Sequence, residues 1–189
     1  IERKLLGTTP VSGEVLPEAV SFDGSSDYLT RSSDMTGNAD SKTFTLSVWV
    51  YLSGNAFQKR LMWIQEGSSW SFYVDVDNSG KQFVVRARNA SDSVILYGIT
   101  SSNSMTYNTW NNILVSVDLA NTSNRSIYVN EVSQSVTWSS YTNDTIDFTR
   151  SSHNLGTGPV GSAIFKGRLA HVFLDYTYRD LSIEANRRL

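Results

Sequence analysis

The sequence predicts an all-β domain, built as an antiparallel sandwich of two sheets. Two patterns support this fold class: strict alternation of apolar and polar residues over 44–51, and two strand-like runs at 70–77 and 82–88 that pair in one register. Further short runs follow between turns rich in Ser, Thr and Asn, and regular short strands of this kind are typical of such sandwiches. A chain of 189 residues is long enough for one domain with a sizeable core.

The first residues predict an arm or linker. Residues 1–18 contain Pro10, Pro17, Gly7 and Gly13 and show no sustained hydrophobic period. We expect the domain itself over 19–189. The chain starts at Ile1 without an initiator methionine, so we expect it to be a piece of a longer protein.

The stretch 44–51 predicts a strand with one face in the core. Successive side chains of a strand point to opposite sides of the sheet. One side therefore carries Phe44, Leu46, Val48 and Val50, and the other carries Thr45, Ser47, Trp49 and Tyr51.

The runs at 70–77 and 82–88 flank a turn cluster at 78–81 and predict a hairpin. The register pairs Asp77 with Gln82, Val76 with Phe83, Val74 with Val85, Phe72 with Ala87, Tyr73 with Arg86 and Ser71 with Arg88. Both strands then keep an apolar face, and a slip of one residue would destroy this match.

The remaining elements are short. Strands are expected over 19–24, 28–30, 59–65, 94–99, 110–119, 125–132, 146–148 and 164–176. The tail at 182–188 predicts a short C-terminal helix with Ser182 as its N-cap, and 133–145 predicts a long polar loop.

The composition excludes several classes of function. The 16 basic and 18 acidic residues are interspersed and give a net charge of −2, so no basic field attracts nucleic acid. No apolar run is long enough for membrane insertion. There are no cysteines, which excludes disulfides and thiolate metal sites.

Several spaced pieces resemble one superfamily. They are Ala19–Gly24, Phe44–Tyr51, Trp110–Val115, Ile127–Asn130, Leu155-Gly156 and Phe165–Leu169, in this order. Together they resemble the laminin-G-like, concanavalin-A-like jelly-roll domains that include pentraxins. The phrasing of 22–31 and 36–40 looks most like versions found in phage virion proteins and bacterial surface proteins. The resemblance implies a jelly-roll sandwich that binds glycans or other proteins and acts on a virion, outside the cell or at the cell surface.

The same resemblance implies calcium as a cofactor. Several of these domains hold calcium with oxygens from rim loops, and calcium prefers about six to eight oxygen ligands. The candidate ligands here are Asp23, Asp27, Asn38 and Asp40. The alternative, which we favour, is that Asp23-Gly24 and Asn38 serve turn geometry.

Two groups of residues suit carbohydrate. Sugar rings stack on aromatic side chains while carboxylates, amides and guanidinium groups bind their hydroxyls. The first group, on the polar face of the hairpin, is Tyr73, Asp75, Arg86 and Arg88, with Trp49 and Tyr51 beside it if the strands are neighbours. The second, in the predicted loop, is Trp138, Tyr141, Asn143 and Asp144. We expect Trp63, Trp70 and Trp110 in the core.

Enzymatic activity is not expected. A glycosidase needs two acids about 5 to 9 Å apart, usually alternating on one strand, and no Glu-x-Asp-x-x-Glu run is present. The two histidines, His153 and His171, do not lie near a Gly-x-Ser-x-Gly elbow. Two hypotheses therefore remain. The first is a non-catalytic module that binds cell-surface polysaccharide, and the second is an assembly domain whose arm and outer sheet contact neighbouring protein subunits.

Overall fold

The computed structural model describes residues 18–54, 59–77, 81–159 and 161–188. Its elements are β1 (Val20–Asp23), β2 (Leu29–Arg31), β3 (Thr43–Leu52), β4 (Lys59–Glu66), β5 (Ser69–Asp77), β6 (Gln82–Arg88), β7 (Val94–Thr100), β8 (Trp110–Asp118), β9 (Arg125–Val129), β10 (Val132–Ser133), β11 (Val136–Tyr141), β12 (Ser152–Leu155), β13 (Lys166–Asp175) and a 3₁₀ turn, η1 (Glu184–Arg187).

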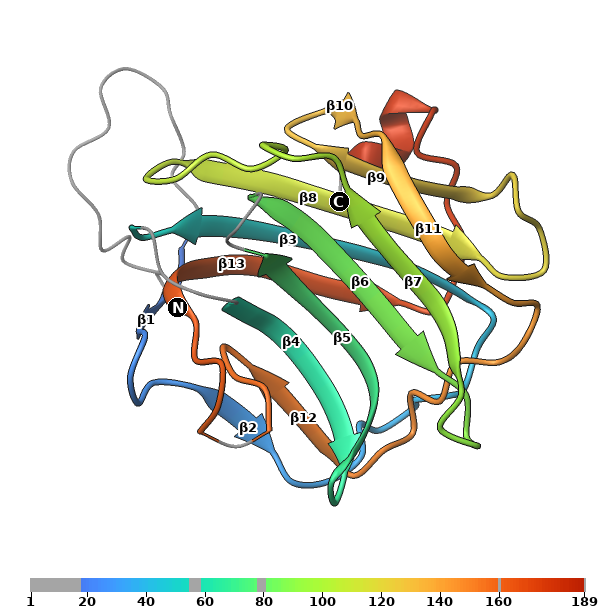
Figure 1. The fold of residues 1–189 in the computed structure, drawn as a ribbon, viewed down its shortest axis with the longest axis horizontal. Coiled ribbons are helices and arrows are strands. Elements are labelled where there is room, and N and C mark those ends of the chain that lie inside the picture. Colours follow the sequence, from blue (N-terminus) through green and yellow to red (C-terminus); the bar gives the residue numbers. More distant parts are fainter. Residues whose placement is uncertain (1–17, 55–58, 78–80, 160, 189) are drawn as a thin grey trace, which may run out of the picture.

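The strands form two antiparallel sheets that face each other across one hydrophobic core (Figure 1). Sheet A has the order β1-β13-β3-β8-β9-β10, and sheet B the order β11-β7-β6-β5-β4-β12-β2. The predicted all-β jelly-roll sandwich is confirmed. The successive strands β1 and β2 lie in different sheets, so the turn between them connects the two layers.

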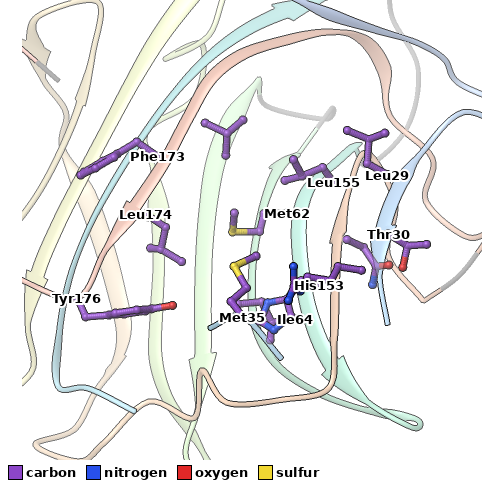
Figure 2. Close-up of a pocket in the computed structure, with 13 residues that line it drawn as sticks. Leu29, Thr30, Met35, Met62, Ile64, His153, Leu155, Phe173, Leu174 and Tyr176 are labelled. Carbon is purple, nitrogen blue, oxygen red and sulfur yellow. The ribbon is translucent and has the colours of Figure 1, made fainter. Parts of the chain in front are cut away.

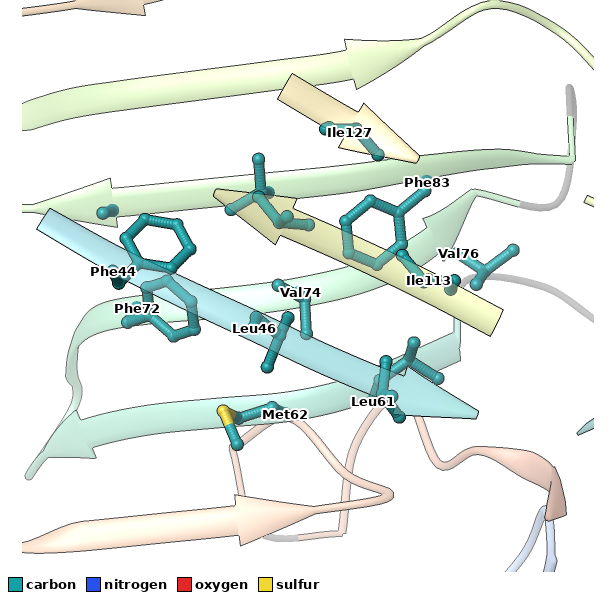
Figure 3. Packing of buried hydrophobic residues seen from close by; sticks show 14 of the residues in the cluster. Phe44, Leu46, Leu61, Met62, Phe72, Val74, Val76, Phe83, Ile113 and Ile127 are labelled. Carbon is teal, nitrogen blue, oxygen red and sulfur yellow. The ribbon is translucent and has the colours of Figure 1, made fainter. Parts of the chain in front are cut away.

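Strand β3 lies inside sheet A, between β13 and β8. Its predicted apolar face is confirmed, because Phe44, Leu46, Val48 and Val50 are all buried in the core. Figure 3 shows Phe44 and Leu46 facing Phe72 and Val74 of sheet B, and the rings of Phe44 and Phe72 meet edge to face with centroids 5.3 Å apart. Such interdigitation of two inner faces supplies most of the apolar burial of a sandwich.

The hairpin of β5 and β6 has the predicted register except for Ser71 and Arg88, which are not part of the ladder. Asp77 pairs with Gln82, Val76 with Phe83, Val74 with Val85, Phe72 with Ala87 and Tyr73 with Arg86. Phe72, Val74, Phe83 and Val85 accordingly point into the core. The turn between the strands falls largely outside the described residues.

Four details of the predicted secondary structure differ in the structure. Residues 136–141, expected in a loop, form β11, and the expected strand at 146–148 makes only an isolated bridge from Ile146 to Ser41. The tail forms η1, a 3₁₀ turn whose N-cap is Ile183 rather than Ser182, with no side-chain capping bond. Strand β9 also ends at Val129, because Asn130 and Glu131 have positive φ and turn the chain.

The C-terminal segment after β13 packs across the outer face of sheet A. Thr45 Oγ1 donates to the carbonyl of Thr177, and the backbone amide of Arg179 donates to Ser116 Oγ. Leu114, which points away from the core, and Leu181 are both fully buried. This segment therefore covers part of the polar face of β3, while Trp49 and Tyr51 remain half-buried.

The predicted arm at 1–18 lies outside the described residues except for Glu18. In the part of the chain that the structure describes, no helix has the length and apolar character needed to span a membrane.

Candidate functional site

The outer face of sheet B carries a continuous layer of aromatic rings and guanidinium groups. We call it the arginine–aromatic face. Strand pairing brings it together, because Arg60 lies opposite Asp75, Trp63 opposite Tyr73, and Arg86 between Tyr73 and Tyr97. Its members are Arg60, Trp63, Trp70, Tyr73, Asp75, Arg86, Arg88 and Tyr97.

Two of the rings form the floor of this face. Trp63 and Tyr73 stack with centroids 5.1 Å apart and are only 4% and 5% exposed. Trp63 Nε1 donates to Gln65 Oε1 at 2.6 Å, which satisfies the buried indole. Trp70 lies edge-on to Tyr73 at 4.7 Å and stays half-buried, as does Tyr97. The rings within reach of a ligand are therefore Trp70 and Tyr97.

Three arginines lie over these rings. The guanidinium carbon of Arg60 lies 4.1 Å from the ring centroid of Tyr73, that of Arg86 lies 4.4 Å from Tyr97, and that of Arg88 lies 3.9 Å from Trp70. Arg86 Nη1 also donates to the Tyr73 hydroxyl at 2.9 Å. Contacts of a cation with an aromatic face are attractive and fix the orientation of the planar guanidinium.

Asp75 is the buried acid of this face. It pairs with Arg60, and its Oδ1 makes no hydrogen bond within the described part of the chain. Burial raises the pKa of Asp75 to about 6, against the opposing effect of Arg60. The carboxylate neutralises one guanidinium of the layer, so the face keeps a positive balance.

The first group predicted from sequence does share one face. Tyr73, Asp75, Arg86 and Arg88 all point outward from sheet B, although their role in binding stays a prediction. The suggested neighbours Trp49 and Tyr51 are not beside them, because β3 belongs to the other sheet.

The prediction that three tryptophans lie in the core is confirmed for Trp63, which is 4% exposed, and wrong for Trp70 and Trp110. Trp63 and Trp70 belong to the arginine–aromatic face, and Trp110 is half-buried against Tyr51 on sheet A. Sequence reasoning also missed Arg60 and Tyr97. Tyr97 lies in a continuous apolar run in the expected strand at 94–99, so the sequence gives no alternation that would place its ring on the outer face.

The second predicted group is divided by the structure. Trp138 and Tyr141 pack against the core from β11, and the Tyr141 hydroxyl donates to the carbonyl of Asp118 at 2.7 Å. Asn143 and Asp144 follow in a turn, where Asn143 Oδ1 accepts from Lys42 Nζ and Asp144 Oδ2 accepts from Asn89 Nδ2. Trp138 and Tyr141 are half-buried, so the binding role of this group stays a prediction.

The four candidate calcium ligands serve local structure. Asp23 accepts from the hydroxyl of Ser25 and from the amides of Ser26, Ser25 and Asp27, and these hydrogen bonds hold the pKa of its carboxyl well below the usual range. Asp27 Oδ2 accepts from the amide of Asp23. These bonds are the turn geometry that the sequence reading favoured.

Asn38 and Asp40 hold a different loop. Asn38 donates to the carbonyl of Phe148 and accepts from the Tyr176 hydroxyl, and Asp40 Oδ1 accepts from the amides of Phe148 and Thr149. Among the described residues, no three acidic or histidine side chains gather as metal ligands would. Calcium stays a prediction, and the donor set fits it poorly, because most of these oxygens already accept hydrogen bonds.

An apolar cleft opens at the other edge of the sandwich, where β2 and β12 of sheet B face β13 of sheet A. Its volume is about 480 Å³. Figure 2 shows Phe173, Leu174 and Tyr176 on one side, Leu29, Leu155 and His153 on the other, and Met35 and Met62 between them. Leu29, Met35 and Phe173 are exposed at its rim.

Comparison with known proteins identifies the family of this fold. Residues 23–175 match the model of the concanavalin A-like lectin/glucanases superfamily. No curated protein sequence matches the chain.

Solved structures share the fold at low identity. The botulinum neurotoxin serotype G binding domain superposes with a TM-score of 0.65 at 10% identity, over 87% of this chain and 40% of that chain. The CBM40 of the Ruminococcus gnavus IT-sialidase, bound to alpha2,3 sialyllactose, gives 0.62 at 12% identity, over 90% and 96%. Domains LG4-5 of the mouse laminin alpha1 chain give 0.56 at 14% identity, over 89% and 44%.

The chain thus spans less than half the length of the toxin and laminin chains. At these identities the likeness concerns the fold. Because the family model covers most of the chain, this protein belongs to the concanavalin A-like lectin/glucanases superfamily.

Proposed function

We propose that the chain is a non-catalytic glycan-binding module that recognises cell-surface polysaccharide. The observation that supports this is the arginine–aromatic face, where the half-buried rings of Trp70 and Tyr97 lie beside oriented guanidinium groups. Rings of this kind stack on the apolar faces of sugars while fixed donors bind hydroxyls. Membership of a superfamily of lectins and glucanases is consistent with a carbohydrate ligand. The sialidase module named above carries a bound sialyllactose.

The acid of the arginine–aromatic face favours binding of a glycan without its cleavage. Asp75 is buried and paired with Arg60, so it lacks the exposure that a catalytic nucleophile needs. We expect no release of reducing ends when the protein is incubated with a polysaccharide that it binds.

The context proposed for the module is a phage virion or a bacterial surface protein, as the phrasing of 22–31 implies. In either place the module would lie outside a cell and meet polysaccharide directly.

A glycan array with the purified chain tests the proposal. We expect binding that weakens when Trp70 is replaced in Trp70→Ala. The matched control is Trp110→Ala, because Trp110 is also half-buried and contacts a tyrosine, but on sheet A. Equal loss in both variants, or no bound glycan, would contradict the proposal.

The alternative is an assembly domain that contacts neighbouring protein subunits. The apolar cleft favours it, because Leu29, Met35 and Phe173 expose large apolar surface together at one edge. Light scattering after size exclusion would then show a specific oligomer that Phe173→Ser dissociates. A monomer at all concentrations would rule this alternative out.

A further inference from the structure

Two guanidinium groups of the arginine–aromatic face have no acidic partner. Arg86 and Arg88 lie on β6 and point to the same side, since both guanidinium groups lie over the Trp70 ring. Within the described residues, neither makes an ion pair. Arg60 and Arg150, the other arginines with a buried acid close by, are both paired with that acid.

The acids nearest to this pair are already engaged. Asp75 is bound by Arg60, and Asp92 accepts from Ser69 Oγ and from Arg150. The charge of Arg86 acts through space on the pKa of Asp75, and that of Arg88 on the pKa of Asp92, but neither arginine bonds to these carboxylates within the described residues. The positive charge of the pair is therefore not cancelled by a direct contact.

The pair is also held in place before any ligand arrives. Trp70 lies under both groups, with its ring centroid 3.9 Å from the guanidinium carbon of Arg88 and 5.5 Å from that of Arg86. Tyr97 and the Tyr73 hydroxyl fix Arg86 further. Because the side chains are already ordered, a ligand loses less of its binding free energy to ordering them.

The remaining donors suit an oxyanion. A guanidinium carries five N–H donors, and Arg88 donates no hydrogen bond within the described part of the chain. Planar forks of this kind bind carboxylate, and more generally oxyanions, with two parallel hydrogen bonds. A neutral sugar would leave the positive charge of the two arginines without a negative partner.

We propose that Arg86 and Arg88 bind the acidic group of a charged saccharide, a carboxylate or a sulfate, while Trp70 and Tyr97 contact its ring. This inference rests on the proposed function and narrows it to acidic glycans. The guanidinium groups and the aromatic rings lie next to each other. The site therefore favours a sugar whose negative group lies within a few ångströms of an apolar face of its ring.

The test is a glycan array that holds neutral, uronic-acid, sialylated and sulfated glycans, followed by calorimetry on the tightest ligand. We expect the bound glycans to be acidic. Comparing the carboxylated with the sulfated glycans then shows which of the two acidic groups the site binds. Removing one charged hydrogen-bonding partner in Arg88→Gln should weaken binding about 10- to 100-fold. Added salt should weaken it further.

Arg86→Gln serves as the second binding variant, and Arg168→Gln as the matched control. Arg168 also lies over a tyrosine ring, that of Tyr51, without an ion pair among the described residues, but on sheet A. Thermal melts establish that each variant is folded. Ligands that are mainly neutral, or an Arg88→Gln affinity equal to that of Arg168→Gln, would overturn the acidic-glycan inference and leave glycan binding standing. An array without any bound glycan would overturn both.

Discussion

The side chain of Asp75 links the charge of the face to the stability of the sheet. It is a buried carboxylate, and burial raises its pKa to about 6. Arg60 and Arg86 lower this pKa and Asp77 raises it, but the loss of hydration dominates. The ionised form of Asp75 therefore destabilises the folded state relative to its protonated form.

Stability should increase on mild acidification because of this residue. An aspartate in an unfolded chain has a pKa of about 4. Between about pH 4 and 6 the folded state consequently binds the proton more tightly, and the free energy of unfolding falls as the pH rises through this window. We expect a gain of roughly 1–3 kcal/mol at about pH 5 relative to about pH 7.5, measured by urea unfolding.

Asp75→Asn should remove most of that gain. Burial also raises the pKa of Asp147, which acts in the same direction, so a small slope should remain. Asp92→Asn is the control, because hydrogen bonding by Ser69 lowers the pKa of Asp92 and it gives no gain in this window. A wild-type protein that is less stable at about pH 5 than at about pH 7.5 would refute this assignment.

The side of the sheet on which a residue of the arginine–aromatic face lies can be predicted only where its strand alternates regularly. The shared face of Tyr73, Asp75 and Arg86 follows from the sequence, because β5 and β6 pair without interruption over these positions. Trp63 lies on the outer side of sheet B because β4 has a register shift between Arg60 and Met62 that reverses the alternation. A bulge of this kind leaves no clear trace in a single sequence.

At the scale of elements, β11 shows how packing overrides composition. Its sequence is polar, and the shift between Trp138 and Ser140 hides its alternation. The strand forms because Trp138 fits over Gly98 of β7, where a side chain would collide with the ring. The long loop predicted from Ser, Thr and Asn content missed this contact between segments about 40 residues apart in sequence.

Gly98→Ala should therefore destabilise the protein. A Cβ atom at this position would lie 2.4 Å from the Trp138 ring, and overpacking of this kind costs about 1–3 kcal/mol. Gly158→Ala is the control, since its Cβ would approach no atom closer than 3.3 Å. Urea unfolding of both variants measures the difference, and equal stability would show that β11 does not pack on β7 as described.

The C-terminal segment is the second element whose role was not evident from sequence. Leu181 is 0% exposed although it lies outside the main core cluster, whereas its neighbour Ile183 is 53% exposed. Leu181→Ala should cost about 2–5 kcal/mol, and Ile183→Ala much less. If thermal unfolding shows the same Tm for both variants, the segment does not seal sheet A.

The loops that carry Asp23 and Asp40 allow a direct test for calcium. Their carboxylates already accept backbone hydrogen bonds, so these turns do not need a metal ion to form. We expect the Tm to be the same in millimolar calcium and in a chelator. A rise with calcium that Asp40→Asn abolishes would restore the calcium prediction.

At the scale of the whole molecule, the outer faces of the two sheets differ in how far other parts of the chain cover them. The outer face of sheet A is partly covered by the chain's own C-terminal segment. The outer face of sheet B is covered only by its own arginines and rings within the described residues, and it presents unpaired positive charge on a protein with a net charge of −2. We therefore expect an acidic glycan to bind to the outer face of sheet B.

The most direct test is a titration followed by nuclear magnetic resonance, in which the indole N–H signals of the five tryptophans report on both faces at once. An acidic oligosaccharide found on the array should shift the Trp70 signal, with smaller effects at Trp63 beneath it. Trp49 and Trp110 on sheet A should not move. Shifts at Trp49 and Trp110 with an unchanged Trp70 would contradict the account, because the ligand would then lie on sheet A.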